Sequence, residues 1–284
     1  MLKHRLIFGA LMTVFFIGFV LLDGWLDGSL TASDHDKPVQ ATVLMILVVV
    51  ALSLGAVEAS KLVADKPFNL LLPASVIGIV LISTAWYWSQ VIGISLGLYL
   101  PLALALVLAG LVVQQHIQFG PAGILVNCGV SSFFILYLGL LGAFFLGIRI
   151  DIGLWELLAF VFVVKSSDIG AYTFGRLFGV HKLAPRVSPG KTWEGLAGAM
   201  VVAMLVSFAF AAASGIMSVW LATIFGGGMA VAGQLSDLTE SMLKRDARQK
   251  DSSNRVPGFG GILDVIDSLL LAAPLAYVFF RALS

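Results

Sequence analysis

Residues 91–113 read VIGISLGLYLPLALALVLAGLVV and contain no charged side chain. A helix needs about 20 apolar residues to cross the roughly 30 Å hydrocarbon core of a bilayer, so this run is long enough to span a membrane. The whole chain has a similar character. Of its 284 residues, 59% are hydrophobic and 12% are charged, about half the charged fraction of a soluble domain. The chain is therefore predicted to be an integral membrane protein without a large soluble domain.

Eight further apolar runs accompany this one. The expected helices lie near 6–22, 39–57, 68–88, 91–113, 122–148, 152–167, 195–214, 217–235 and 262–280. The runs are too long, and alternate too little, for the strands of a closed barrel. We predict an all-α polytopic helical bundle of about nine transmembrane helices, with N-terminal helices in 1–120 and a C-terminal catalytic region in 121–284. The first run is expected to be a retained helix and not a cleaved signal peptide.

The basic residues predict the orientation of these helices. Lys and Arg are enriched in cytoplasmic loops, and nine spans place 13 of the 17 basic residues on one side, three on the other and Lys165 within a span. The N-terminus is therefore expected in the cytoplasm, together with two long polar loops, 168–194 and 236–261. The acidic segment from Asp23 to Asp36 is expected outside, as a solvated loop.

Carboxylates flank the second polar loop. Asp264 and Asp267 are three residues apart on a predicted helix, so both face the same way, and Asp237 follows another span. Like charges so placed are costly near lipid unless a cation lies between them. Oxygen ligands without His or Cys favour Mg²⁺ over zinc, with Mn²⁺ or a second cation as open alternatives. We therefore predict a metal site at Asp237, Asp264 and Asp267.

Both polar loops also carry groups that suit phosphate. The second loop contains Lys244, Arg245, Arg248, Lys250 and Arg255, followed by a glycine-rich stretch. Such cations and close backbone N–H groups bind phosphate oxygens, although a basic stretch beside a membrane also contacts anionic lipid head groups. The first loop offers Ser188, Lys191 and Thr192 just before a predicted helix, whose N-terminus favours an anion. Pro185 occupies the position where a P-loop needs its first glycine, which excludes that motif.

These loops resemble the signature of the CDP-diacylglycerol synthase family, also called phosphatidate cytidylyltransferases. The resemblance covers Asp237-Leu-Thr-Glu-Ser-Met-Leu-Lys-Arg245, Lys250-Asp251 and Pro257-Gly-x-Gly-Gly-Ile-Leu-Asp264-x-x-Asp267, together with Asp168-x-Gly-Ala-Tyr172 and Ser188-Pro-Gly-Lys-Thr192. The chain departs from the family pattern at two positions. Phe259 replaces the usual histidine and Val265 replaces the usual arginine.

The resemblance implies that CTP and phosphatidate react to give CDP-diacylglycerol and pyrophosphate. It implies an enzyme of the bacterial inner membrane with its active site facing the cytoplasm, and it suggests a homodimer. The expected catalytic residues are Asp237, Lys244, Arg245, Asp264 and Asp267. The expected substrate-binding residues are Asp168, Ser188, Lys191, Thr192, Ser241, Lys250 and Asp251.

Three alternatives stay open at this point. A related CTP-dependent lipid kinase would release CDP instead of pyrophosphate. An ion-coupled transporter would place ionisable residues near the middle of the membrane, where only Glu156 and Lys165 are candidates. An inactive relative would have lost function through the changes at positions 259 and 265. The net charge of +1 gives no indication of a nucleic-acid partner.

Overall fold

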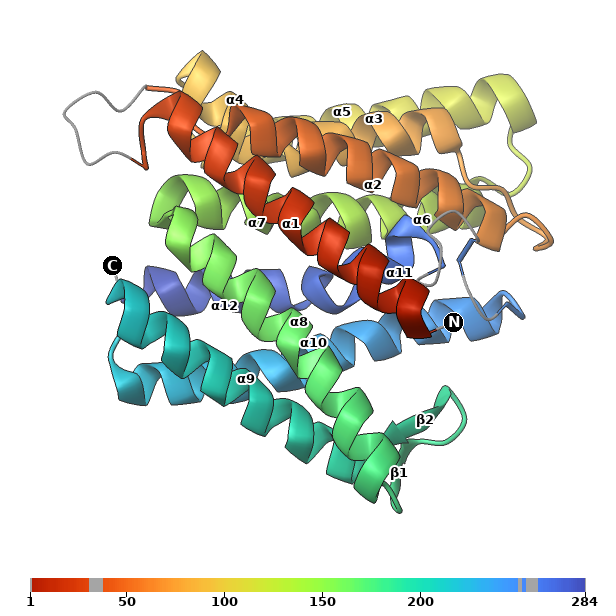
Figure 1. Ribbon diagram of the computed structural model, residues 1–284. Helices are drawn as coiled ribbons and strands as arrows, with labels where there is room; N and C mark the ends of the chain where they lie inside the picture. The colour runs from red at the N-terminus through yellow and green to blue at the C-terminus, as the bar shows by residue number, and fades with distance from the viewer. Residues whose placement is uncertain (1, 31–37, 250–251, 254–259, 284) are drawn as a thin grey trace. The chain divides into compact units, whose positions relative to one another are not determined.

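The computed structural model describes residues 2–30, 38–249, 252–253 and 260–283. Its helices, traced in Figure 1, are α1 Leu2–Asp27, α2 Thr42–Leu62, α3 Leu72–Ser83, α4 Ala85–Ile92, α5 Leu96–Phe119, α6 Ile124–Phe134, η1 Ile135–Leu140, α7 Leu141–Gly147, η2 Ile148–Ile152, α8 Leu154–Phe178, α9 Trp193–Ser214, α10 Val219–Asp246, α11 Ile262–Leu270 and α12 Ala272–Arg281. The strands β1 Lys182–Ala184 and β2 Ser188–Thr192 form one small antiparallel hairpin. The chain is an all-α polytopic membrane protein, as predicted.

Seven helical stretches among the described residues are long and apolar enough to cross a membrane. They are Thr42–Leu62, Leu96–Phe119, Ile124–Ile152, Leu154–Phe178, Trp193–Ser214, Val219–Asp246 and Ile262–Arg281. The pair α3 and α4, bent by 62°, brings the number to eight if it is one span. The predicted count of nine is therefore not confirmed, although α1 covers the remaining predicted run, 6–22.

The chain divides into two compact units. The first contains residues 1–150 and 251–265, and the second contains 151–250 and 266–284. This boundary differs from the predicted one at residue 120, and the predicted division into N-terminal helices and a catalytic region stays a prediction. The second boundary falls within α11, so Asp264 belongs to the first unit and Asp267 to the second.

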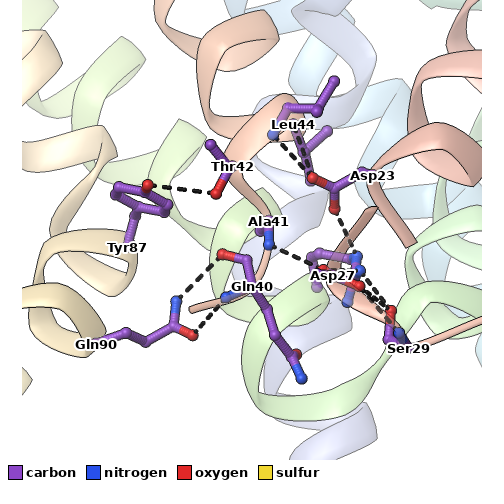
Figure 2. Close-up of polar contacts among 11 residues, drawn as sticks. Asp23, Asp27, Ser29, Gln40, Ala41, Thr42, Leu44, Tyr87 and Gln90 are labelled. Carbon is purple, nitrogen blue, oxygen red and sulfur yellow. Dashed lines mark hydrogen bonds and ion pairs between the residues drawn. The ribbon is translucent and has the colours of Figure 1, made fainter. Parts of the chain in front are cut away.

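Hydrogen bonds in the first unit join helix ends in two groups. At one end, the backbone N–H of Leu71 before α3 donates to Ser131 of α6, and that of Ala74 donates to Gln114 of α5. At the other end, Gln40 before α2 exchanges hydrogen bonds with Gln90 of α4 (Figure 2). Two groups of helix ends are expected for helices that cross a membrane in alternating directions.

The acidic segment that begins at Asp23 differs from the prediction of a solvated loop. Asp23 and Asp27 lie within α1 and are buried, as is Arg149 of η2, to which both carboxylates are paired at 3.1 and 2.6 Å. Figure 2 shows the same two carboxylates accepting backbone N–H groups at the start of α2, where Ala41 and Leu44 donate. The prediction was wrong for these two residues, because an arginine distant in sequence and a helix start compensate their burial. Residues 31–37 lie outside the described part.

Both predicted polar loops are shorter than expected. Helix α8 continues to Phe178 and α10 continues to Asp246, so residues 168–178 and 236–246 are helical. These helical extensions lie beyond the apolar part of each span, so their polar side chains need not face lipid. Their backbone hydrogen bonds are still satisfied within the helix. The hairpin of β1 and β2 occupies most of what remains of the first loop.

Close packing in the second unit depends on small residues. Helix α9 packs along both α8 and α10. A Cβ atom at Gly226 of α10 would lie only 2.6 Å from the Cα of Met204 in α9, and one at Gly170 of α8 would lie 2.8 Å from the carbonyl oxygen of Gly198. Glycine at these positions lets the helix backbones approach closely.

Candidate active site

Polar residues of the second unit lie together along the C-terminal parts of α8 and α10 and at Asp267 of α11. The last turns of α10 present Asp237, Glu240, Ser241 and Lys244. Their spacing of three and four residues puts them on one face of the helix. Glu240 is fully buried, and Ser241 and Lys244 are nearly so. This polar face therefore points into the unit and not towards lipid or water.

A break between α11 and α12 brings Asp267 to this face. In a continuous helix the carbonyl of Asp267 would accept the N–H of Leu271. Here the hydroxyl of Ser236 in α10 lies between them: it donates to the Asp267 carbonyl and accepts the Leu271 N–H at 3.0 Å. A side chain inserted into the hydrogen-bond ladder is a known cause of helix breaks. The single helix predicted over 262–280 is thus interrupted at Leu271, where α10 and α11 are held together.

Three carboxylates converge as a result. Asp237, Glu240 and Asp267 each offer an oxygen within 4.8 Å of the other two. Glu240 and Asp267 are buried and Asp237 is half-buried. Negative charges this close repel one another strongly unless cations compensate them. Hard oxygen donors in this arrangement fit Mg²⁺, and two of the three were predicted as its ligands.

Lysines from three elements compensate these acids. Lys191 of β2 lies 2.7 Å from Asp237, and Lys244 pairs with Glu240 one turn earlier on α10. Lys165 of α8 donates to Ser268 at 2.8 Å and lies 3.7 Å from Asp168. Four carboxylates and three ammonium groups leave this cluster with a formal charge of −1. The arrangement therefore favours one additional cation.

The hairpin of β1 and β2 positions Lys191. Strand β2 pairs with β1 in antiparallel register, with Thr192 opposite Lys182 and Ser188 opposite Ala184. The side chain of Arg245 in α10 donates to the carbonyl of Val187, just before β2, at 3.1 Å. Thr192 is buried and its hydroxyl accepts the N–H of Gly195, which caps α9. These contacts hold both ends of the strand that carries Lys191.

A second row of contacts links α8 to α10. Gln234 donates to Asp168 at 3.2 Å, and its backbone carbonyl accepts from Lys191 at 3.1 Å. Ser241 donates to Asp237 at a long 3.4 Å. Asp168 therefore lies in the network around the three carboxylates, as its expected place in the site requires.

Asp264 has a different environment. It lies in the first turn of α11, where its carboxylate accepts the N–H of Gly261 at 2.7 Å and the hydroxyl of Ser252 at 2.6 Å. This is the geometry of a helix cap, and it belongs to the first unit. Its metal-binding role stays a prediction. Lys250 and Asp251, both expected to bind substrate, lie outside the described residues.

The structure adds residues that the sequence prediction passed over. Glu240 lies three residues after Asp237 within the quoted motif, and the helical spacing alone could have placed it on the same face. Lys165 is an ionisable residue inside an apolar run, which is by itself a sign of function. Gln234 gave no comparable signal, because an uncharged amide beside glycine and leucine is common in membrane helices.

Comparisons with known proteins point to one family. The profile of the cytidylyltransferase family matches residues 3–283. A phosphatidate cytidylyltransferase of Haemophilus influenzae is 44% identical over 137 residues, which is 46% of this chain and 48% of that protein. The phosphatidate cytidylyltransferase of Chlamydia muridarum is 35% identical over 178 residues, which is 58% of this chain and 57% of that protein. That of Bacillus subtilis is 40% identical over 148 residues, which is 50% of this chain and 54% of that protein. The matched segments span about half the length of these curated relatives.

Proposed function

The chain belongs to the cytidylyltransferase family, and on that premise we propose that it condenses CTP with phosphatidate to give CDP-diacylglycerol and pyrophosphate. The observation that carries the proposal is the convergence of Asp237, Glu240 and Asp267 beside Lys191 and Lys244. Acids and lysines at one end of membrane helices suit a reaction between a soluble triphosphate and a lipid phosphate at the membrane surface.

The charges of the site match the steps of this reaction. An oxygen of the phosphatidate phosphate attacks the α-phosphorus of CTP, and the bond from that phosphorus to the bridging oxygen of the β-phosphate breaks. The electron pair leaves with pyrophosphate, so negative charge accumulates on the leaving group. Lys191 and Lys244 supply the ammonium groups that bind it. The attacking phosphate is already ionised at neutral pH, so no strong general base is needed.

The proposed cofactor is Mg²⁺, held by Asp237, Glu240 and Asp267, with Asp264 as a further ligand predicted from sequence. When bound, the ion would neutralise charge on the triphosphate and orient its phosphates. The carboxylates would hold the ion in place, while Ser268 and Asp168 orient the ammonium group of Lys165. Mn²⁺ or a second cation is the alternative to test in the same assay.

We further propose that the site faces the cytoplasm of a bacterial inner membrane. The distribution of Lys and Arg supports this orientation, since the ends of α8 and α10 that carry the site, together with the segments that follow them, hold eight of the ten basic residues of the second unit. Ser188, Thr192, Ser241 and Arg245 are proposed to complete the substrate contacts. A homodimer is proposed from the family resemblance, and the mass of the purified particle would test it.

The direct test uses purified protein in detergent with phosphatidate, Mg²⁺ and CTP labelled with ³²P. With label at the α-phosphorus, we expect labelled lipid and release of unlabelled pyrophosphate, both abolished by EDTA. With label at the γ-phosphorus, we expect labelled pyrophosphate and unlabelled lipid. Lipid labelled from the γ-position would identify a kinase instead. If folded protein gave no labelled lipid with either labelled form of CTP, the proposal would be rejected.

A further inference from the structure

Glu58 is a buried carboxylate within an apolar helix of the first unit. It lies on α2, in a stretch of 21 residues with a mean hydropathy high enough to cross a membrane, and its side chain is 0% exposed. A charged group in such a helix is expensive to bury, so it is normally retained for a role. The proposed chemistry of the second unit makes no use of it.

Both oxygens of Glu58 are engaged by residues some 200 positions away in sequence. One oxygen, Oε1, accepts the hydroxyl of Ser253 at 2.8 Å. The other, Oε2, accepts the backbone N–H of Leu263 at 3.0 Å and the hydroxyl of Ser252 at 3.3 Å. A single side chain of α2 therefore contacts both the start of α11 and residues 252–253 of the segment that joins α10 to α11.

The contact with Leu263 acts on a helix start. The first N–H groups of a helix have no partner within it, and a carboxylate there satisfies a donor and interacts favourably with the helix dipole. Asp264 does this from within α11 by accepting the Gly261 N–H, and Glu58 does it from α2. The hydroxyl of Ser252 lies within hydrogen-bonding distance of both carboxylates. The start of α11 is thus fixed by two acids that meet at one serine.

The glycines of this segment are explained by the same contacts. A Cβ atom at Gly261 would collide with the Ser252 hydroxyl and with the Glu58 carboxylate. Gly260 has φ of +102°, a conformation that side chains with a Cβ rarely adopt. The glycine pair was interpreted from sequence as a place for a phosphate to approach the backbone. At Gly261 the group that approaches is Glu58.

We propose that Glu58 is a positioning residue for the transferase reaction: it fixes the start of α11, the helix that carries Asp264 and Asp267. It contacts neither substrate and acts through Leu263, Ser252 and Ser253. The kinetic part of this inference rests on the proposed function, whereas the anchoring of α11 does not.

Glu58→Gln tests both parts. The amide has nearly the same size but turns one acceptor into a donor, so it cannot accept from Ser253 and Leu263 together. We expect amide hydrogen exchange at Leu263 to become faster by about tenfold, since a charged hydrogen bond is lost. We also expect the Mg²⁺ concentration for half-maximal activity to rise by about tenfold while KM for phosphatidate stays the same. A purely structural role would reduce the amount of folded protein without changing this Mg²⁺ requirement.

Two further variants complete the experiment. Glu156→Gln makes the same change on α8, in its first turn and away from the polar residues at the other end of that helix, and should leave exchange at Leu263 and the Mg²⁺ requirement unchanged. Ser253→Ala removes one donor and keeps the buried acid, so it should shift both readouts in the direction of Glu58→Gln even if that variant fails to fold.

The outcomes separate the two claims. Unchanged exchange at Leu263 in folded Glu58→Gln and Ser253→Ala would overturn the anchoring, and faster exchange with an unaltered Mg²⁺ requirement would overturn the positioning role. If folded wild-type protein made no CDP-diacylglycerol, the proposed function and the kinetic claim would fall together. Exchange at Leu263 would then still decide whether Glu58 anchors α11.

Discussion

Two buried clusters of acids and bases, one in each unit, differ in how completely their charges are satisfied. In the first unit, Arg149 lies between Asp23 and Asp27, and every carboxylate oxygen has a partner. The partners include backbone N–H groups at the start of α2 (Figure 2). In the second unit, Asp237, Glu240 and Asp267 crowd together, and lysines pair with the first two of them.

This difference separates a structural cluster from a reactive one. Two acids around one arginine, with five backbone or hydroxyl donors, have a partner at each carboxylate oxygen. Three converging acids are unfavourable by themselves, because their mutual repulsion is relieved only by added positive charge. The first arrangement stabilises the fold, whereas the second is the one that we propose to bind a cation and, through the lysines, phosphate.

The largest effect is expected from Asp267→Asn. It removes one charge from the three converging carboxylates without changing the volume, so cation binding should fail while the fold is kept. We expect the transfer of label from CTP to lipid to fall by at least about a hundredfold, as for the loss of a principal electrostatic group. Full turnover by this variant would remove Asp267 from the metal site.

Arg149→Met should lower the stability of the protein strongly and leave the rate of cytidylyl transfer unchanged. The two buried aspartates would lose their cation, which costs about 3–5 kcal/mol when a buried ion pair is broken. Thermal unfolding in detergent, monitored by circular dichroism, should show a large drop in midpoint. Activity per folded molecule should stay near that of the wild type, and a selective loss of turnover would place Arg149 in the chemistry after all.

Lys191→Met compares a lysine of the cluster with one of the hairpin surface. Lys191 pairs with Asp237, whereas Lys182, opposite Thr192 on β1, is exposed. Loss of a charge-assisted contact with phosphate should lower kcat/KM for CTP by about 10-fold to 100-fold. Lys182→Met serves as the matched control and should retain wild-type kinetics. Equal losses in the two variants would mean that the hairpin, and not Lys191, is what matters.

The smallest effect is expected from Val265→Arg, which restores the arginine usual in the family. The described site already contains three lysines, so one more cation should leave the rate of transfer similar or raise it by a few-fold. Steady-state kinetics with CTP would measure this. A collapse of activity in normally folded protein would show that this chain has adapted its surroundings to valine.

Helices and much of the site could be predicted from sequence because their signals are local. Uncharged runs of membrane length gave the spans, and the acids and lysines next to two of those runs gave candidate site residues. The family motifs pointed to Lys191 and Asp168 as well. Helix ends were less accurate, because polar residues continue α8 and α10 beyond the apolar part of each run.

Contacts between distant segments could not be predicted in this way. Nothing near Asp23 in sequence indicates that it is buried and paired with Arg149. Nothing near Glu58 indicates that it accepts the backbone N–H of Leu263. The break at Leu271 depends on the hydroxyl of Ser236 in another helix, and the place of Lys165 depends on Ser268. Each of these features is a property of tertiary packing, where a partner from elsewhere in the chain changes what a polar residue does.

Glu240 provides the sharpest test of whether Asp237, Glu240 and Asp267 support transfer of the cytidylyl group. Label transfer from α-³²P-labelled CTP to phosphatidate should be measured in parallel for Glu240→Gln and Glu156→Gln, two identical chemical changes on helices of the same unit. If the three carboxylates support the transfer, label transfer is lost in Glu240→Gln and kept in Glu156→Gln, with both proteins folded. Wild-type transfer by Glu240→Gln would contradict this role of the carboxylates.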